Sequence, residues 1–364
     1  MKAYIICIIV TLLLNFFAEK FFKKNHKFLG LLFMGISLFT LCFIAGVRNL
    51  TVGTDVNVYV SRLIHVSNNS IDIFNYLKNS NSDLLFALLI YLGNLSKSAH
   101  FVLFLIELAV ALPIYIYAYK TKEKNSLSIT ILIFFLTMYC VSFNLMRQSI
   151  AIAICILAYY YFNNRQSNKA YILLIVAALF HKTALIFVIT FFINWMIKSR
   201  IKYKVFLIFL TIVCLVFAGL FMDKIVMLTS YSKYLNMSNF MRNFSWGSIL
   251  KIIFWIGLGI LSYNKIVDKE YKLDTMIAIL FASISLVLTI TSFKIPGTGR
   301  LGYYFIDLFY FLIIFEIPKS FKQRKIILFI VVSILAILWW KMTAVENDIS
   351  KVNPYQSDII NFLN

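Results

Sequence analysis

The 364-residue sequence has few of the residues that form soluble surfaces and loops. Charged residues make up only 14% of it, and it contains only 4 prolines and 12 glycines. An ordinary soluble domain has about 25% charged residues, so this composition excludes a soluble globular protein. Hydrophobic residues fill 61% of the chain instead, and the mean hydropathy is +0.85. We therefore expect an all-α fold, a polytopic transmembrane helical bundle.

Cysteine and acidic residues are also scarce. The five cysteines show no CxxC motif and no Cys/His spacing, which argues against a metal site or a disulfide framework. We accordingly expect no metal ion and no cofactor. Lys and Arg outnumber Asp and Glu by 35 to 15, giving a net charge of +20. This excess does not predict nucleic-acid binding, because most of it lies in short clusters between apolar segments and no compact basic domain remains.

The apolar segments and the basic clusters alternate along the chain. About thirteen apolar segments lie at roughly 3–18, 28–47, 84–96, 100–119, 127–143, 148–162, 170–180, 183–197, 205–222, 248–263, 273–292, 301–318 and 326–340. The basic clusters are Lys20/Lys23/Lys24/Lys27, Lys120/Lys122/Lys124, Arg165/Lys169, Lys198/Arg200/Lys202/Lys204, Lys265/Lys269/Lys272 and Lys319/Lys322/Arg324/Lys325. The positive-inside rule places these clusters in the cytoplasm.

One conflict remains between residue 48, which must be outside, and residue 120, which must be inside. Two apolar segments occupy this stretch, although it permits only an odd number of crossings. Segment 84–96 is the shorter, with about 13 residues or roughly 20 Å of helix, so we expect it to be re-entrant or interfacial. About 12 crossings remain, with both termini outside, in a single membrane-embedded domain over 1–364. Its expected external parts are the loops at about 48–83 and 223–247 and the tail 342–364.

The first polar break in the apolar sequence covers residues 46–59. Arg48 ends an apolar segment about 20 residues long, and Gly53 permits a bend that turns Asp55 back toward Arg48. We interpret this stretch as the floor of an active site at the outer face of a membrane. An arginine that reaches interfacial water, followed by an Asx turn, explains the same residues without a site.

Two further breaks place basic residues at expected outer helix ends. Arg147 begins a returning helix, and its five N–H donors suit a phosphate or a carboxylate. A tight polar break between two apolar runs places His181 and Lys182 at the membrane boundary. His181 is a candidate proton carrier, and a structural interfacial histidine is the alternative.

The fourth break is a Pro- and Gly-containing turn that precedes a polar helical stripe. Arg300, Tyr303, Tyr304 and Asp307 follow the i, i+3, i+4 and i+7 spacing of one helix face. We expect Asp307 to face a cavity, because an intramembrane carboxylate costs roughly 2.5 to 3.5 kcal/mol at mid-span. A structural Arg–Asp contact between two helices is the alternative. Glu107, in the middle of segment 100–119, invites the same reasoning.

Taken together, these motifs resemble the EpsG family, a group of the Wzy-type O-antigen and capsular polysaccharide polymerases. The motifs are Gly46-Val47-Arg48 with Gly53-Thr54-Asp55 and Tyr59, Met146-Arg147-Gln148, His181-Lys182-Thr183-Ala184, and Gly299-Arg300 with Tyr303-Tyr304. They occur in family order over about residues 46–310. The resemblance implies a GT-C-like glycosyltransferase of the bacterial inner membrane. Such an enzyme joins undecaprenyl-diphosphate-linked oligosaccharide repeat units at the external face, in O-antigen, capsule or exopolysaccharide biosynthesis.

That reaction requires a base for the acceptor hydroxyl and cations for the departing diphosphate. Asp55 and His181 are the candidate catalytic residues, with Asp55 slightly preferred because Arg48 would hold it. The residues expected to bind substrate and diphosphate are Arg48, Arg147, Gln148, Lys182, Arg300, Tyr59, Tyr303 and Tyr304. Because basic side chains can neutralise the diphosphate, we expect a metal-independent enzyme. Membrane lipid and a chain-length regulator protein are its further expected partners.

Other functions share parts of this pattern. A lipid-linked oligosaccharide flippase or exporter would have the same composition. It needs a polar path open to both faces of the membrane, whereas the Arg, His and Asp motifs here are expected at one face. A membrane O-acyltransferase would need a histidine in a deep apolar setting, for which His181 is the only plausible candidate. A ligase acting on the same glycans is a further alternative.

Overall fold

The computed structural model describes residues 2–198, 246–266, 268–292, 297–320, 333–334, 337, 340 and 352–360. Within these residues every regular element is a helix, which confirms the all-α prediction. The chain divides into two compact units, which are described separately. Unit 1 comprises Met1–Leu185 and Val332–Asn364, and unit 2 comprises Ile186–Val331. The single membrane-embedded domain over 1–364 stays a prediction.

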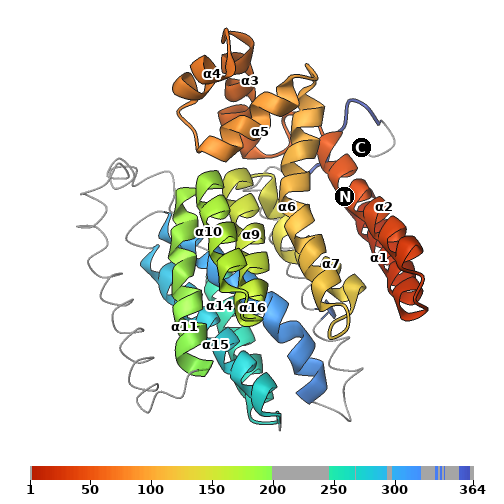
Figure 1. Cartoon of the computed structure of the whole chain (residues 1–364), viewed down its shortest axis with the longest axis vertical. Helices are drawn as coiled ribbons and strands as arrows, with labels where there is room; N and C mark the ends of the chain where they lie inside the picture. The colour runs from red at the N-terminus through yellow and green to blue at the C-terminus, as the bar shows by residue number, and fades with distance from the viewer. Residues whose placement is uncertain are drawn as a thin grey trace. The chain divides into compact units, whose positions relative to one another are not determined.

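The long helices of unit 1 match the apolar segments expected from the sequence (Figure 1). They are α1 (Lys2–Lys23), α2 (Lys27–Gly46), α6 (Ala99–Thr121), α9 (Met146–Asn163) and α10 (Ser167–Phe180). Consecutive members of this series pack on one another, so α2 contacts α1 and α6, and α9 contacts α6 and α10. The expected segment 127–143 forms α7 (Leu127–Phe134), a π-helical turn η2 (Phe135–Tyr139) and α8 (Cys140–Ser142).

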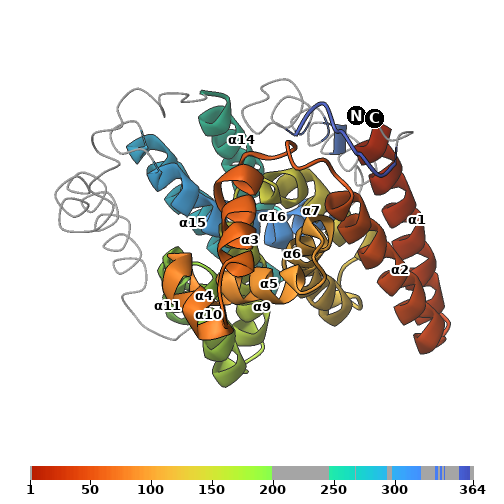
Figure 2. The same cartoon turned by 90° about the horizontal axis from the view of Figure 1, so that it is seen from above.

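Short helices occupy the stretch that the sequence analysis treats as an external loop. They are the π-helical turn η1 (Val56–Val60), α3 (Ser61–Asn68) and α4 (Ile73–Ser80). Helices this short are marginal alone, so contacts with α5 (Leu84–Asn94) hold them: the Tyr76 hydroxyl donates to the Ala87 carbonyl at 3.0 Å. Figures 1 and 2 show these elements covering one end of α9 and α10. At 11 residues, α5 is about 16 Å long, shorter than a hydrocarbon core, as expected for segment 84–96.

Unit 2 contains α11 (Val188–Lys198), α14 (Trp246–Tyr263), α15 (Lys269–Thr291) and α16 (Thr298–Ser320). Helix α15 packs against α11, α14 and α16, and an ion pair of 2.8 Å joins Lys198 on α11 to Asp274 on α15. A 3₁₀ helix η3 (Lys182–Phe187) leads into α11. The expected segment 205–222, most of 326–340 and most of loop 223–247 lie outside the described residues.

Four of the described helices are long and apolar enough to cross a membrane. They are Lys2–Lys23, Lys27–Gly46, Ala99–Thr121 and Tyr271–Thr291. Shorter apolar helices occur at Leu84–Asn94, Leu127–Ser142, Ser167–Phe180 and Gly247–Tyr263. The chain is therefore a helical membrane protein, and the expected number of about 12 crossings stays a prediction.

The two ends of unit 1 differ in character. At one end, Glu19 near the end of α1 accepts hydrogen bonds from Lys23 at 2.9 Å and from Ser126, which precedes α7, at 2.7 Å. Phe22 packs on Tyr119 near the end of α6 with 5.6 Å between ring centroids. The basic clusters of unit 1 follow or precede these same helix ends. The polar motifs Arg48, Arg147 and His181 lie at the opposite ends of their helices, as the sequence predicts.

The described part of the C-terminal tail packs against the motif end of unit 1. The Tyr355 hydroxyl donates to the Ile44 carbonyl at 2.8 Å, and the Ser357 hydroxyl donates to the Val47 carbonyl at 2.6 Å. The Asn49 amide donates to the Gln356 carbonyl at 2.7 Å. The tail therefore satisfies carbonyls at the end of α2 that would otherwise lack helical partners.

Gly53 allows the turn after Arg48 to pack closely against another loop. Its φ is +96°, and a Cβ there would lie 2.6 Å from the Phe143 carbonyl oxygen. We predict that Gly53→Ala destabilises the protein by about 1 to 3 kcal/mol, through backbone strain and the clash. Gly35→Ala is the matched control, because a Cβ at Gly35 has no neighbour within 4 Å in the described structure and Ala favours a helix. Thermal unfolding in detergent that ranks Gly53→Ala equal to or above Gly35→Ala would contradict this prediction.

Candidate functional site

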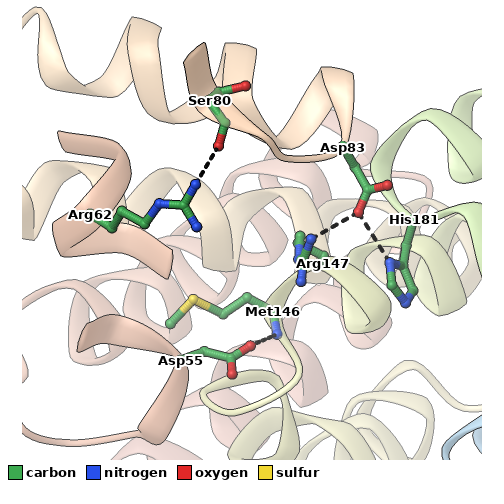
Figure 3. Close-up of polar contacts among 7 residues, drawn as sticks. All are labelled: Asp55, Arg62, Ser80, Asp83, Met146, Arg147 and His181. Carbon is green, nitrogen blue, oxygen red and sulfur yellow. Dashed lines mark hydrogen bonds and ion pairs between the residues drawn. The ribbon is translucent and has the colours of Figure 1, made fainter. Parts of the chain in front are cut away.

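Helix α9 begins at the end of unit 1 that carries Arg48, Arg147 and His181. The backbone N–H of Met146, its first residue, donates to Oδ2 of Asp55 at 3.3 Å (Figure 3). A carboxylate there stabilises the helix because the free N–H groups of the first turn carry partial positive charge. Arg147 follows directly, so a cation lies in the same first turn. A cation is unfavourable in that position unless an anion lies beside it.

Asp83 provides that anion. One oxygen of Asp83, Oδ2, accepts from Nη1 of Arg147 at 3.1 Å and lies 3.2 Å from Nδ1 of His181 (Figure 3). The three side chains are mostly buried, with exposed fractions of 9% for Asp83, 20% for Arg147 and 18% for His181. An ionised carboxylate only accepts hydrogen bonds, so Nδ1 of His181 carries the proton in this contact. In the neutral ring Nε2 is then a proton acceptor.

The π-helical turn η1 positions an aromatic ring against the same arginine. The guanidinium carbon of Arg147 lies 4.1 Å from the centroid of the Tyr59 ring and 6.0 Å from that of Phe86. These contacts cover the face of the planar guanidinium and leave its N–H edge for hydrogen bonds. Of the guanidinium nitrogens of Arg147, only Nη1 donates a hydrogen bond to a described residue. The other N–H groups of Arg147 can therefore donate to an anionic ligand.

Sequence reasoning missed Asp83. It precedes the apolar run of α5, where an aspartate is the ordinary residue to cap a helix start. The structure shows an extended backbone at Asp83 and no hydrogen bond from its own helix to its side chain. The sequence around Asp83 therefore has the pattern of a helix cap, although its side chain binds Arg147 and His181 instead of capping α5. Only the contact with Arg147 and His181, which lie 64 and 98 residues away, reveals this role.

A second set of contacts attaches the loop of Asp55 to the turn before α9. The amide and hydroxyl of Thr54 both donate to Oδ1 of Asn144, at 2.7 and 2.9 Å. Together with Gly53 against Phe143, these bonds hold Asp55 at the start of α9. The structure therefore brings Asp55, Tyr59, Arg147 and His181 together, as the sequence analysis expects of one site.

Arg48 has a different environment from the one expected. We anticipated that Asp55 would face it, but no ion pair joins these two described residues, and Arg48 is only 1% exposed. Its Nη1 donates to the Ala45 carbonyl at 2.6 Å and its Nε to the Val52 carbonyl at 3.3 Å. Its guanidinium carbon lies 3.9 Å from the centroid of Phe143. The end of α2 offers carbonyl oxygens to a cation, so Arg48 is held by the backbone and not by Asp55.

Glu107 of α6 has an identifiable partner. Its Oε2 accepts from the Ser142 hydroxyl at 2.8 Å, and it is 1% exposed. Glu107 and Arg48 also attract each other electrostatically. The glutamate therefore faces the interior of unit 1, as reasoned for intramembrane carboxylates.

The remaining predicted binding residues divide between the two units. In unit 1, Gln148 is buried in α9, and Lys182 is exposed beside His181. In unit 2, α16 carries an exposed Arg300, a partly exposed Tyr303 and a buried Tyr304. Asp307, on the next turn of α16, is 5% exposed, so it faces the interior of unit 2, where Lys251 of α14 attracts it. The structure does not place Arg300, Tyr303 and Tyr304 relative to His181.

The described residues include no group of three or more His, Cys, Asp or Glu side chains arranged to hold a metal ion. The charged cluster at the start of α9 offers instead a proton acceptor, Nε2 of His181, and unused donors of Arg147. Such a cluster can bind an anion and accept a proton from a hydroxyl.

The fold and the cluster define a polytopic α-helical membrane protein with a polar site where its helices end. A family model described as the EpsG family matches residues 31–357, and the chain belongs to this family of Wzy-type polysaccharide polymerase-like proteins. Comparisons with curated proteins and with solved structures give no match. The family match spans both units and includes every residue of the cluster.

Proposed function

We propose that this protein is an oligosaccharide repeat-unit polymerase of the bacterial inner membrane, with a GT-C-like fold of about 12 crossings. It joins undecaprenyl-diphosphate-linked repeat units at the external face, in O-antigen, capsule or exopolysaccharide biosynthesis. Membership of the EpsG family supports a membrane polysaccharide polymerase-like function. The observation that carries the proposal is the convergence of Arg147 and His181 on Asp83 at one end of unit 1.

The proposed reaction needs no redox step. The acceptor hydroxyl of one lipid-linked unit attacks the anomeric carbon of the sugar that links the growing chain to its carrier. A glycosidic C–O bond forms, the C–O bond to the diphosphate breaks, and undecaprenyl diphosphate leaves with the electron pair. The hydroxyl proton passes to a base on the protein.

Arg147 is the residue best placed to stabilise the leaving diphosphate. It lies at the start of α9, where backbone N–H groups also favour negative charge. Its paired donors match two phosphate oxygens, and the exposed Lys182 adds charge without fixed geometry. Metal-independent neutralisation of the diphosphate is part of the proposal. Arg300, Tyr303 and Tyr304 of α16 are proposed to bind the sugar and phosphate portions of the same substrates.

His181 is the better candidate for the base. The sequence preference for Asp55 depended on Arg48 holding it, and Arg48 is bonded to the backbone instead. Asp55 accepts from the Met146 N–H, so one of its oxygens is committed to the helix start. His181 is oriented by a carboxylate through Nδ1 and presents Nε2, the arrangement that activates hydroxyl groups in other enzymes.

The orientation follows from the charge difference between the ends of unit 1. The basic clusters after α1, α6 and α9 lie at the ends away from the site, which the positive-inside rule assigns to the cytoplasm. The site end and both termini are then external. Membrane lipid and a chain-length regulator protein are the proposed partners.

The proposal is tested with purified protein and lipid-linked repeat units, by measuring polymer length and released undecaprenyl diphosphate. The expected result is polymer with stoichiometric carrier release. Arg147→Lys retains the charge but loses the paired donors, so we predict that kcat/KM falls by about tenfold to a hundredfold. Arg62→Lys is the matched control, because Arg62 donates to the Ser80 carbonyl and not to Asp83 (Figure 3). Equal losses in the two variants, or no polymer from the unaltered protein, would contradict the proposal.

The identity of the base is tested by two substitutions to asparagine. His181→Asn retains an N–H group that can reach Asp83 but removes Nε2, so we predict that kcat falls by about 10² to 10⁴. Asp55→Asn retains an oxygen for the Met146 N–H, so we predict a loss of less than about tenfold if the charge only supports the helix start. The reverse ranking, with correctly inserted protein in both cases, would assign the base to Asp55.

A further inference from the structure

Two aspartates begin neighbouring helices in unit 1 but use their side chains differently. Asp72, before α4, accepts from the Asn75 N–H of its own helix at 2.7 Å. Ser98, before α6, does the same for Phe101 at 3.3 Å. Asp83, before α5, has the same extended backbone, yet its carboxylate turns to Arg147 and His181. A position before a helix therefore does not explain why the Asp83 carboxylate points to Arg147 and His181, whereas its contacts with these two residues do.

The two contacts of Asp83 compete for one atom. Both bonds go to Oδ2, at 3.1 Å from Nη1 of Arg147 and 3.2 Å from Nδ1 of His181. Each bond draws electron density from the oxygen that the other shares, so losing one partner strengthens the contact with the other. A ligand that takes Arg147 would therefore leave the Asp83 carboxylate to His181 alone.

A diphosphate is such a ligand. It carries more negative charge than a carboxylate, and it offers several oxygens in the geometry of the guanidinium fork. Arg147 is part exposed and has unused donors among the described contacts, so a diphosphate can approach it without first unfolding the cluster.

We propose that Asp83 is a positioning residue that occupies Arg147 until the substrate diphosphate binds there. When the diphosphate takes Arg147, the Asp83 carboxylate interacts with His181 alone and orients it as the base. This inference rests on the proposed polymerase function and adds a coupling between diphosphate binding and the state of the base. Asp83 itself does not touch the reacting atoms. It weakens diphosphate binding, because its carboxylate competes for the same guanidinium, and it favours turnover, because it orients His181.

These opposite contributions give a signature that a purely structural residue does not produce. Asp83→Asn retains the shape of the side chain and removes its charge, so Arg147 becomes available to a diphosphate without competition. We expect the purified full chain to bind undecaprenyl diphosphate about threefold to tenfold more tightly, since the competing ion pair is partly exposed. We expect kcat for polymerisation to fall by about tenfold or more, because His181 loses its charged partner.

Three variants make the test independent of folding defects. Asp83→Ser retains a residue that is favoured at a helix start and should bind the carrier as tightly as Asp83→Asn does. Asp72→Asn is the matched control, an aspartate that caps its own helix, and it should change neither binding nor kcat. Arg147→Gln should weaken binding in every background.

The binding measurement separates this inference from the proposed function. If the unaltered chain binds undecaprenyl diphosphate through Arg147, but folded Asp83→Asn and Asp83→Ser bind equally or more weakly, the coupling is wrong and the polymerase proposal stands. If the unaltered chain and Arg147→Gln bind alike, both fail. Tighter binding together with a lower kcat in both Asp83 variants supports the inference.

Discussion

The site end of unit 1 depends on a buried cation, Arg48. Its guanidinium is buried from water, so its charge must be met by carbonyls of α2 and of the following loop and by the face of Phe143. Burial lowers the pKa of Arg48, and the fields of Glu107 and nearby tyrosines act in the opposite direction. This single side chain therefore joins the end of α2, the Gly53 turn and the loop before α9. The C-terminal tail closes the same region through Tyr355 and Ser357.

The charged cluster is built on this support. Once the Gly53 turn is held against Phe143, Asp55 reaches the start of α9 and η1 places Tyr59 on Arg147. Asp83 then completes the set from the start of α5. Mostly buried charges of this kind are costly without partners, so Arg147 needs an anion beside it, either Asp83 or an anionic ligand. That constraint supports the proposal that the substrate carries a diphosphate.

The sequence predicted the parts of this structure that depend on local pattern. Apolar length defined α1, α2 and α6, and the positions of Arg147 and His181 at helix ends correctly indicated that they lie on one side of unit 1. Three features could not be predicted from the sequence, because they depend on contacts between residues far apart in the chain. Asp83 has the pattern of an ordinary cap, helices α3 and α4 are too short to form without α5, and the tail contacts residues more than 300 positions away. The expected contact between Arg48 and Asp55 was wrong, because a charge beside a loop is usually exposed, whereas the backbone here provides the partners of Arg48.

The central claim is that the cluster at the start of α9 joins repeat units outside the cell. Its most direct test is the length ladder of surface glycan in a strain from which this chain is deleted and then restored either unaltered or as His181→Asn at equal membrane levels. The account predicts a full ladder with the unaltered chain and products of a single repeat, transferred outside, with His181→Asn. A full ladder with His181→Asn, or lipid-linked units that accumulate on the cytoplasmic side, would contradict it.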